Sequence, residues 1–535
     1  MTTSTFKGIL NHTDSNPLKD PCLRMNLFWT FCLTLSAVFV GYDSALFNSL
    51  QALPSFFAQF PELATDSNLL GIVGAVYSLA GIYTPFFAGW LADKYGRKVP
   101  IIPGMVGLCF SPAVMACAKS LGVLILGRWL LGTSTFLCMN ICVALLVEIA
   151  HPRFRPIAAA VYLCGYYLGS IICSLVTLGT YLHFPDSPWS WKTPTLVQIA
   201  LPIILLPAYA MMSGSPRWLV AQGRIEDAKA LFAKIHANDH LDDPLVAFEL
   251  QETVEAITAE KKASSFSALF KSRANRWRAG ILLTVGGGSS FTGSSVVTYY
   301  FTSVLKSVGI TSYTNILLIS AGLNASDRLD IGLGISNLFF ALLGALMVER
   351  MGRRGLWLTS TGSMLVFMTI VTALSATFVK TGSAAVGGAT VAFLFLFFAG
   401  YDVGFTSLAY AYAAEILPYT LRTSGLAFQN AAGCIGLFFS LWVNPVALAH
   451  IGWKYYLVFI ACLVLIFTIQ WFYFPETKGL TLEEVAIRFE GAEGDLSGID
   501  PGVIRAKYQE DKVEKDHVED PVKVETGFAP ASAEA

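Results

Sequence analysis

GWLADKYGRK, residues 89–98, follows an apolar run and holds four formally charged side chains within six positions, and a similar stretch, GALMVERMGRR, occupies residues 344–354. Charged side chains of this kind gather at the ends of membrane-spanning helices, where they reach water. We call each of these two charged stretches a charged corner. Their presence in one chain raises the question of whether the chain repeats a larger unit.

Two more pairs of landmarks recur in the same order. EIAHPRFR (148–155) corresponds to EILPYTLR (415–422), with Glu and Arg seven positions apart in both, and SPRWL (215–219) corresponds to PETKG (475–479). Landmarks that repeat in order at a separation of about 260 residues indicate a duplicated structural unit. The sequence therefore predicts two similar halves.

Composition assigns the chain to the membrane. Of its 535 residues, 54% are hydrophobic and only 14% are charged, whereas about a quarter of the residues of a soluble domain are charged. The formal net charge of −1 provides no basic field that would attract nucleic acid. We therefore expect a polytopic protein of the lipid bilayer with no nucleic-acid partner.

Twelve apolar runs approach the length of about 20 residues that crosses the hydrocarbon of a bilayer. Loops rich in Lys and Arg alternate with poorer loops, so the positive-inside rule places the richer set and both termini in the cytoplasm. The predicted spans are 27–47, 69–91, 101–118, 122–149, 157–182, 194–213, 279–305, 330–349, 356–378, 387–413, 423–447 and 455–474. The predicted domains are a tail (1–26), a six-helix bundle (27–213), a cytoplasmic linker with short helices (214–277), a second bundle (278–475) and a tail (476–535) that is disordered after about residue 490.

The ordered motifs resemble those of one family. GWLADKYGRK, EIAHPRFR, ERMGRR, EILPYTLR and PETKGLTLEEV together are similar to the motifs of the sugar porter branch of the major facilitator superfamily, and YDVGFT (401–406) resembles its fungal lactose-permease-like and hexose-transporter-like group. The resemblance implies an all-α fold of twelve transmembrane helices in two pseudosymmetric six-helix bundles. It also implies that a monomer takes up a sugar by alternating access in the plasma membrane.

The charged corners then have a predicted role in gating. Acidic partners at fixed offsets favour ion pairs that form across the two halves and hold one state closed. The alternative is that these charges only orient the chain, although basic residues alone would do that. The predicted gating residues are Asp93, Arg97, Glu148, Arg155, Arg217, Glu349, Arg353, Glu415, Arg422 and Glu476.

Two ionisable residues lie inside predicted spans, Asp43 in the first and Arg128 in the fourth. Such residues are costly in a membrane and usually face a cavity or each other. The GYD motif around Asp43 resembles that of proton-coupled sugar porters, which implies that Asp43 takes up a proton and is then released from Arg128. The alternative is a static pair in a transporter that is not coupled to protons.

The substrate site departs from the family pattern in the seventh span. Sugar porters carry two Gln, an Asn and a Tyr pair there, and this chain has SSFTGSSVVTYY (289–300), with Ser in place of all three amides. Leu163 likewise stands where relatives carry Gln or Asn. An amide offers donors and acceptors to sugar hydroxyls, whereas Ser offers one short hydroxyl. The predicted substrate-binding residues are Ser289, Ser290, Thr292, Ser295, Tyr299, Tyr300, Asn337, Tyr410 and Asn430.

Three functions follow from these observations. The first is a sugar/proton symporter, whose partners are a small-molecule substrate and a proton. The second is a transporter or exporter of a non-sugar compound such as a secondary metabolite, because the amides are missing. The third is a nutrient sensor, which the short C-terminal tail disfavours.

No catalytic cluster or metal motif occurs, so we expect no enzyme activity, cofactor or metal. Asn324 is a predicted glycosylation site.

Overall fold

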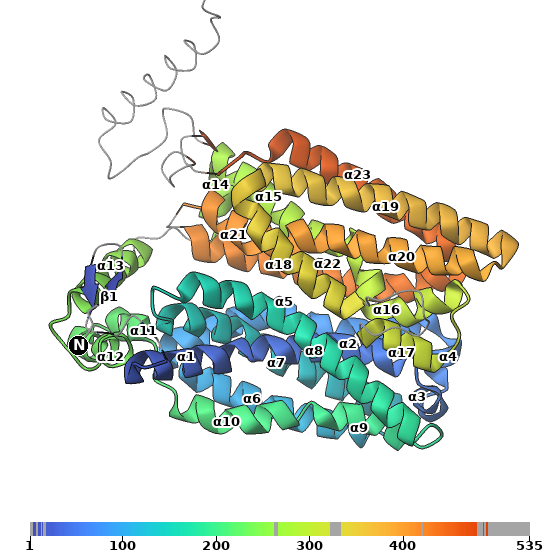
Figure 1. Cartoon of the computed structure of the whole chain (residues 1–535), viewed down its shortest axis with the longest axis horizontal. Coiled ribbons are helices and arrows are strands. Elements are labelled where there is room, and N and C mark those ends of the chain that lie inside the picture. Colours follow the sequence, from blue (N-terminus) through green and yellow to red (C-terminus); the bar gives the residue numbers. More distant parts are fainter. Residues whose placement is uncertain are drawn as a thin grey trace, which may run out of the picture. The chain divides into compact units, whose positions relative to one another are not determined.

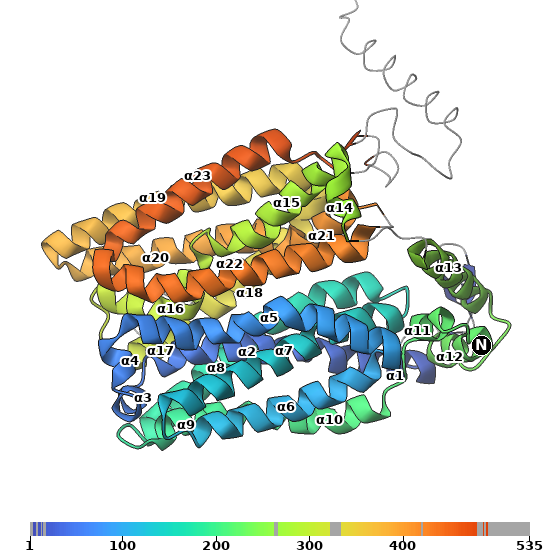
Figure 2. The ribbon, with the colours of Figure 1, turned by 180° about the vertical axis from the view of Figure 1, so that it is seen from behind.

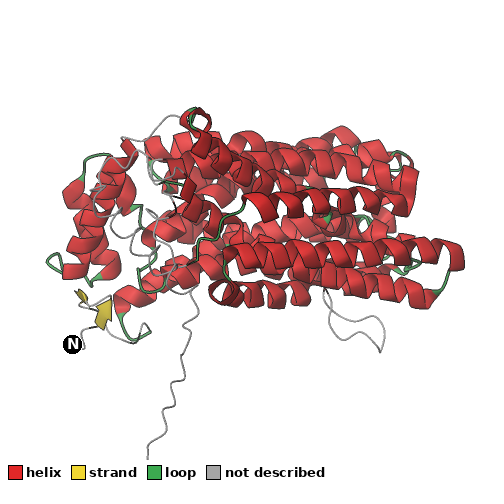
Figure 3. Ribbon diagram, turned by 90° about the horizontal axis from the view of Figure 1, so that it is seen from above, coloured by secondary structure: helices red, strands yellow, loops and turns green. Residues whose placement is uncertain are grey.

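The computed structural model describes residues 4–6, 9–11, 13, 16, 18–261, 266–321, 333–418, 421–478, 485, 488 and 489. Residues 1–479 form one compact unit and residues 480–535 form a second. The first unit contains all of the helices discussed below, and the long ones run side by side along its long axis (Figures 1 and 3).

The N-terminal half consists of long apolar helices joined by short turns. Its first span combines α1 and α2, and a side-chain cap from Asp20 followed by Pro21 starts it within the predicted tail, earlier than hydropathy alone predicts. The helices are α1 (Pro21–Thr34), α2 (Ser36–Leu50), α3 (Pro54–Gln59), α4 (Glu62–Thr65), α5 (Ser67–Tyr95), α6 (Lys98–Ala116), α7 (Leu121–Ile149), α8 (Arg155–His183), α9 (Trp189–Val197) and α10 (Ala200–Met211).

The C-terminal half repeats this pattern with two irregularities, a break in its first span and a π-helical turn. The elements are α15 (Arg273–Ser290), α16 (Ser294–Ser307), α17 (Tyr313–Ala321), α18 (Leu333–Met351), α19 (Arg353–Thr381), α20 (Ala384–Tyr401), the π-helix η1 (Asp402–Thr406), α21 (Ser407–Ile416), α22 (Arg422–Ile451), the 3-10 helix η3 (Gly452–Tyr455) and α23 (Tyr456–Tyr473).

The break corrects the predicted seventh span, which ran without interruption over 279–305. The helix stops at Ser290, and Gly293 adopts φ +97°, a left-handed conformation that glycine reaches without strain, before α16 begins at Ser294. Within the described residues, nine helical segments are long and apolar enough to cross a membrane, and several of them, such as Ser424–Tyr473 with α22 and α23, contain more than one helix. This is a multi-pass membrane protein.

The linker between the halves is helical, as its sequence predicts. It contains α11 (Pro216–Ala221), α12 (Ile225–His236), α13 (Pro244–Lys261) and α14 (Ala268–Lys271), and α11–α13 gather at one end of the bundle (Figures 1 and 2). Phe232 and Val246 belong to a small apolar core that holds α12 against α13. Two short strands, β1 (Ser4–Phe6) and β2 (Ile9–Asn11), pair antiparallel in the predicted tail. We call this side of the molecule the linker end and the side of α3 and α4 the far end.

The helices of each half pack closely where glycines allow it. A Cβ atom on Gly169 of α8 would lie 2.1 Å from the carbonyl oxygen of Val38 in α2, so only glycine fits at this crossing. Small residues at helix crossings let backbones approach and are the usual means of association in membranes. Gly179, ten residues further along α8, has open space around its Cβ position among the described residues.

The two halves meet along a seam formed by α5 with α22, α2 with α16, and α8 with α17 and α18. Hydrogen bonds across this seam occur near the far end. Asn48 Oδ1 accepts from the backbone N–H of Thr302 (2.9 Å), Gln51 Nε2 donates to the carbonyl oxygen of Tyr299 (3.0 Å), and Trp442 Nε1 donates to Asn68 Oδ1 (2.6 Å). These bonds hold the halves together at the far end.

Candidate functional site

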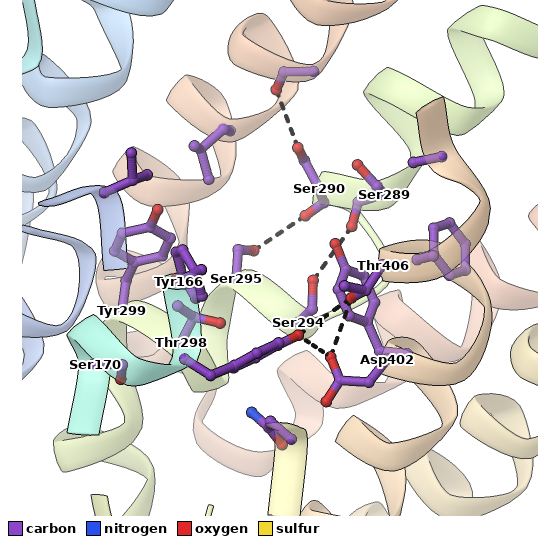
Figure 4. A pocket seen from close by; sticks show the side chains of 18 of the residues that line it. Tyr166, Ser170, Ser289, Ser290, Ser294, Ser295, Thr298, Tyr299, Asp402 and Thr406 are labelled. Atoms are coloured by element: carbon purple, nitrogen blue, oxygen red, sulfur yellow. Dashed lines mark hydrogen bonds between the residues drawn. The ribbon is translucent and has the colours of Figure 1, made fainter. Parts of the chain in front are cut away.

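A cavity of about 420 Å³ lies between the two halves and is lined by side chains of both. Figure 4 shows hydroxyl groups of α15 and α16 in the middle of the view, with Tyr166 and Ser170 of α8 on one side of them and Asp402 and Thr406 of η1 on the other. The break after Ser290 positions these hydroxyls, because it turns the end of α15 and the start of α16 toward the same space.

The structure brings most of the predicted substrate-binding residues to this cavity. Two of the predicted residues are not among its lining. Thr292 lies in the break, where its hydroxyl donates to the carbonyl oxygen of Ser289 (2.8 Å), and Tyr300 donates to the carbonyl oxygen of Leu441 (2.6 Å) in the seam. The lining includes Ser289, Ser290, Ser295, Tyr299, Asn337, Tyr410 and Asn430.

The three serines that replace the family's amides already donate their hydroxyl protons. Ser289 donates to the carbonyl oxygen of Gly286 (2.6 Å) and Ser290 to that of Gly433 (3.2 Å). Ser295 donates to the carbonyl oxygen of Ser290 (3.1 Å) and lies 2.5 Å from the hydroxyl of Ser440. These hydroxyls therefore stabilise the broken helix and offer a solute mainly their acceptor lone pairs.

The cavity contains a carboxyl group that our sequence analysis missed. Asp402, at the start of the π-helix η1, is 1% exposed, and its Oδ1 accepts from the hydroxyls of Tyr167 (2.5 Å) and Thr406 (3.1 Å). The bond to Tyr167 joins the two halves, since Tyr167 belongs to α8. Asp402 is an acidic residue inside the apolar run 387–413. Ionisable residues inside a span usually face a cavity, and this rule, which singled out Asp43, also predicts a site at Asp402. Tyr166, Ser170 and Thr298 also line the cavity (Figure 4) and were not predicted.

Asp43 and Arg128 are buried, at 4% and 2% exposure, but they do not form the predicted ion pair. Asp43 Oδ2 accepts from the hydroxyl of Thr135 (2.6 Å). Arg128 donates through Nε to the carbonyl oxygen of Val73 (2.8 Å), and its guanidinium lies 4.3 Å from the ring centre of Phe47. Arg128 Nη1 is buried and has no hydrogen-bond partner among the described residues. The two charges are thus held by other groups.

The repeated landmarks build the same arrangement twice at the linker end. In the N-terminal corner, Arg97 pairs with Glu148 (3.3 Å), which also accepts from the hydroxyl of Ser215. In the C-terminal corner, Arg353 pairs with Glu415 (2.9 Å), which also accepts from the hydroxyl of Thr477 (2.5 Å). One arginine, one glutamate and one hydroxyl therefore recur in each half, as the repeats at 89–98, 148–155 and 215–219 and their counterparts imply.

These ion pairs differ from the predicted ones, which would have crossed between the halves. Each joins helix ends of a single half, and Asp93 supports the first of them through a 2.8 Å contact with Arg97. Arg155 pairs with Glu249 of the linker helix α13 (3.1 Å). Arg217 lies in α11 and Arg422 begins α22. Asn324 and the side chains of Leu163 and Glu349 lie outside the described residues. The gating role of all these residues stays a prediction.

Glu476 caps α19. Its carboxylate accepts from the backbone N–H groups of Arg353 (2.8 Å) and Arg354 (3.0 Å), the first residues of that helix, and from those of Thr477 and Lys478. Partial burial would raise the pKa of Glu476, but these four donors outweigh it and lower that pKa below the ordinary value. A carboxylate at a helix N-terminus contributes about 0.3–1 kcal/mol of stability.

Glu476→Gln is expected to lower the thermal stability of the purified protein at neutral pH, because the amide keeps the shape but loses the charge. The folded protein has the lower pKa, so this stabilisation is fully present above the ordinary Glu pKa of about 4.3 and is lost as the pH falls from that value through the lower pKa of the folded state. The stability gap between wild type and variant should therefore close on acidification. A gap that persists at acidic pH, or that Glu252→Gln on the exposed side of α13 reproduces, would contradict this assignment.

Comparisons with known proteins agree with this architecture. The profile of the family described as "Sugar (and other) transporter" matches residues 29–489. "MFS-type transporter oryC" of Aspergillus oryzae is 27% identical over 468 residues, which cover 86% of this chain and 84% of that protein. "Sugar transporter STL1" of Saccharomyces cerevisiae is 28% identical over 507 residues, which cover 92% of this chain and 86% of that protein.

Solved structures share the fold. The proton:xylose symporter XylE bound to 6-bromo-6-deoxy-D-glucose superposes with a TM-score of 0.70 at 21% identity, over 87% of this chain and 99% of that chain. The inward open conformation of XylE from E. coli superposes with a TM-score of 0.69 at 19% identity, over 86% of this chain and 99% of that chain. The chain belongs to the sugar porter family of the major facilitator superfamily.

Proposed function

We propose that the protein carries a small polyhydroxylated solute, in the first place a sugar, across the membrane by alternating access and in symport with protons. The observation that supports this most is the cavity of about 420 Å³ between the halves. Its size falls within the range of about 300–1,000 Å³ that is typical of small-molecule sites. Hydroxyl and amide side chains from both halves line it, so rocking of the halves would expose a bound solute to either side in turn.

Asp43 and Arg128 supply the proposed proton coupling. Both are buried in the N-terminal half, and within the part of the chain that the structure describes Arg128 Nη1 has no hydrogen-bond partner. An ionised Asp43 would be drawn to this guanidinium, whereas a protonated Asp43 has no charge to hold it there. Protonation and the arrangement of α2 and α7 are then linked, which is what symport requires.

The linker end is proposed to face the cytoplasm and the far end the outside of the cell, at the plasma membrane. Lys94, Arg97, Lys98, Arg153 and Arg155 flank helices at the linker end, where the positive-inside rule expects them. The hydrogen bonds across the seam join the halves at the far end, which supports a state of the transport cycle in which solute does not enter from the outside.

Uptake of radiolabelled glucose, galactose, xylose and lactose by a transporter-deficient yeast that expresses the protein tests the proposal. Uptake should be saturable and faster at acidic than at neutral external pH. Asp43→Asn cannot bind the proton, so it should lose the acid stimulation and about tenfold or more in accumulation, which corresponds to about 1.4 kcal/mol. Asp186→Asn, an exposed change at the far end, is the matched control and should behave as wild type. Unchanged acid stimulation in Asp43→Asn would reject the coupling.

A second candidate cargo is a less hydroxylated compound, which the bonding of the serines favours. Ser289, Ser290 and Ser295 direct their protons to neighbouring backbone carbonyls, so they offer fewer donors than the amides they replace. Absence of uptake for all four sugars, with the protein present at the cell surface, would select this candidate.

A further inference from the structure

Two amide side chains of α22 lie one helical turn from the point where Ser290 meets that helix. Ser290 of α15 donates to the carbonyl oxygen of Gly433. Gln429 precedes Gly433 by four positions, so both residues lie on one face of α22. Gln429 and its neighbour Asn430 also line the cavity. The helix α22 therefore brings two amides next to the span in which serines replace the amides of the family.

The amide group of Gln429 has a defined orientation. Its Nε2 donates to the carbonyl oxygen of Ala409 in α21 (3.0 Å), and Ala409 also lines the cavity. A carbonyl oxygen can only accept, so the nitrogen of the amide faces Ala409 and the oxygen lies at the other end. The bond to α21 therefore holds Oε1 in place as an acceptor.

This acceptor is not used by the part of the chain that the structure describes. Gln429 is 3% exposed, and its Oε1 is buried with no hydrogen-bond partner among the described residues. A buried acceptor without a donor is costly, because it has lost its bonds to water and gained none in return. Since Gln429 belongs to the wall of the cavity, a hydroxyl group of a bound solute can supply the donor when the wall adjusts around it.

Asn430 offers the complementary group. The hydroxyl of Tyr410 in α21 donates to Asn430 Oδ1 (3.1 Å), which makes Nδ2 the end of this amide that can bind a solute. The two neighbouring amides are thus bound to α21 through opposite ends, Gln429 through its nitrogen and Asn430 through its oxygen. Their other ends are an acceptor and a donor, and two adjacent hydroxyl groups of a sugar match this pair, because one can donate while the other accepts.

We propose that Gln429 and Asn430 form a subsite for two adjacent hydroxyl groups of the solute, in which Gln429 Oε1 accepts from one hydroxyl and Asn430 Nδ2 donates to the other. Tyr410 and the carbonyl group of Ala409 are positioning groups, since they fix which end of each amide binds the solute. This inference rests on the proposed transport of a sugar and assigns the residues that recognise its hydroxyls. Two amides of α22 take the place of those that the seventh span lacks.

Competition between radiolabelled D-glucose and its 2-, 3-, 4- and 6-deoxyfluoro analogues tests the subsite in transporter-deficient yeast. Each analogue carries fluorine in place of one hydroxyl, and fluorine has no proton that it could donate to Gln429 Oε1. In wild type, at least one analogue should inhibit uptake about tenfold or more weakly than unlabelled glucose does, the scale expected when one buried acceptor is left without its donor. We call this analogue the discriminated analogue.

Three variants identify the group that recognises the hydroxyl. Gln429→Met keeps the length of the side chain but removes the acceptor, so KM for glucose should rise about tenfold and the discriminated analogue should inhibit as well as glucose does. Gln429→Glu keeps an acceptor oxygen at this position and should retain the discrimination. Gln470→Met is the matched control, because Gln470 of α23 is also buried with no partner for Oε1 among the described residues but does not belong to the cavity lining. It should retain the wild-type KM and discrimination.

The outcomes distinguish this inference from the proposed function. Equal inhibition by glucose and all four analogues in wild type, or discrimination that survives in Gln429→Met, overturns the subsite and leaves sugar transport standing. A lower maximal rate in Gln429→Met with unchanged KM and unchanged discrimination assigns Gln429 to the packing of α21 against α22, and this also overturns the subsite. If Gln429→Met does not reach the cell surface, Gln429→Ala, which leaves space instead of filling it, is measured in its place.

A second readout decides the case in which wild type takes up no sugar. The proposed function then fails, and the thermal stability of the purified protein is measured with glucose and with each analogue. Stabilisation by glucose that Gln429→Met abolishes and Gln470→Met retains supports the subsite. Absence of stabilisation in wild type, or its persistence in Gln429→Met, rejects it.

Discussion

Gly169→Leu is expected to abolish folded protein at the membrane. The first side-chain atom would lie 2.1 Å from the carbonyl oxygen of Val38 and 2.8 Å from the backbone nitrogen of Tyr42. Both obstacles are backbone atoms of α2, so no side chain can rotate away, and α8 and α2 would have to separate. Overpacking of this kind costs about 1–3 kcal/mol or more, and a whole Leu side chain at a helix crossing belongs at the upper end.

Fluorescence-detected size-exclusion chromatography of a tagged protein measures the loss directly. The matched control is Gly179→Leu in the same helix, where no heavy atom of the described residues lies within 4 Å of the Cβ position. The control should give a monodisperse peak at wild-type yield, while Gly169→Leu should give aggregate or no peak. Comparable peaks for both variants would show that α8 can move away from α2 at little cost.

Gly71→Leu is expected to lower the transport rate about 10- to 100-fold while the protein stays folded. A Cβ atom at Gly71 of α5 would lie 2.4 Å from the carbonyl oxygen of Trp442 in α22, on the other side of the seam. The clash falls between the halves and leaves the packing inside each half intact. Overpacking by about 1–3 kcal/mol then disfavours the state in which the far end is closed, and each 1.4 kcal/mol shifts that equilibrium about tenfold.

Uptake of whichever sugar wild type transports fastest is the readout, normalised to protein at the cell surface. Gly388→Leu is the control, because the Cβ position of Gly388 in α20 is surrounded by open space. It should transport at the wild-type rate. Wild-type uptake by Gly71→Leu would mean that the far end need not close as tightly as this structure shows.

Hydropathy predicts the long helices well because burial in lipid and burial in the protein both favour apolar residues. The predicted spans 69–91 and 122–149 correspond to Ser67–Tyr95 and Leu121–Ile149. Helix starts are missed where polar residues form the first turn, as at Arg353, whose predicted span began at residue 356. The break at Gly293 was missed because glycine occurs both inside membrane helices and between them, and its φ of +97° depends on the surrounding packing.

In the candidate site, too, the sequence predicts some features, and others depend on the packing of the folded chain. The resemblance to the sugar porter motifs named nine candidate substrate-binding residues, and seven of them line the cavity. The motifs could not show that Thr135 binds Asp43, since an alcohol in an apolar helix usually bonds to its own backbone. Nor could they show that Arg97 and Glu148 join helices of one half, because a charge pattern fixes which groups are available and the fold decides which of them meet.

The duplicated corners separate the residues that build each half from those that line the cavity. Arg97 with Glu148 and Arg353 with Glu415 bind helix ends to one another at the linker end, away from the cavity. The chain can therefore exchange residues such as Ser289 or Asp402 during evolution without giving up the contacts that keep the halves rigid. A scaffold arranged in this way can acquire a new specificity through a few substitutions, which makes its overall sequence a poor guide to what it carries.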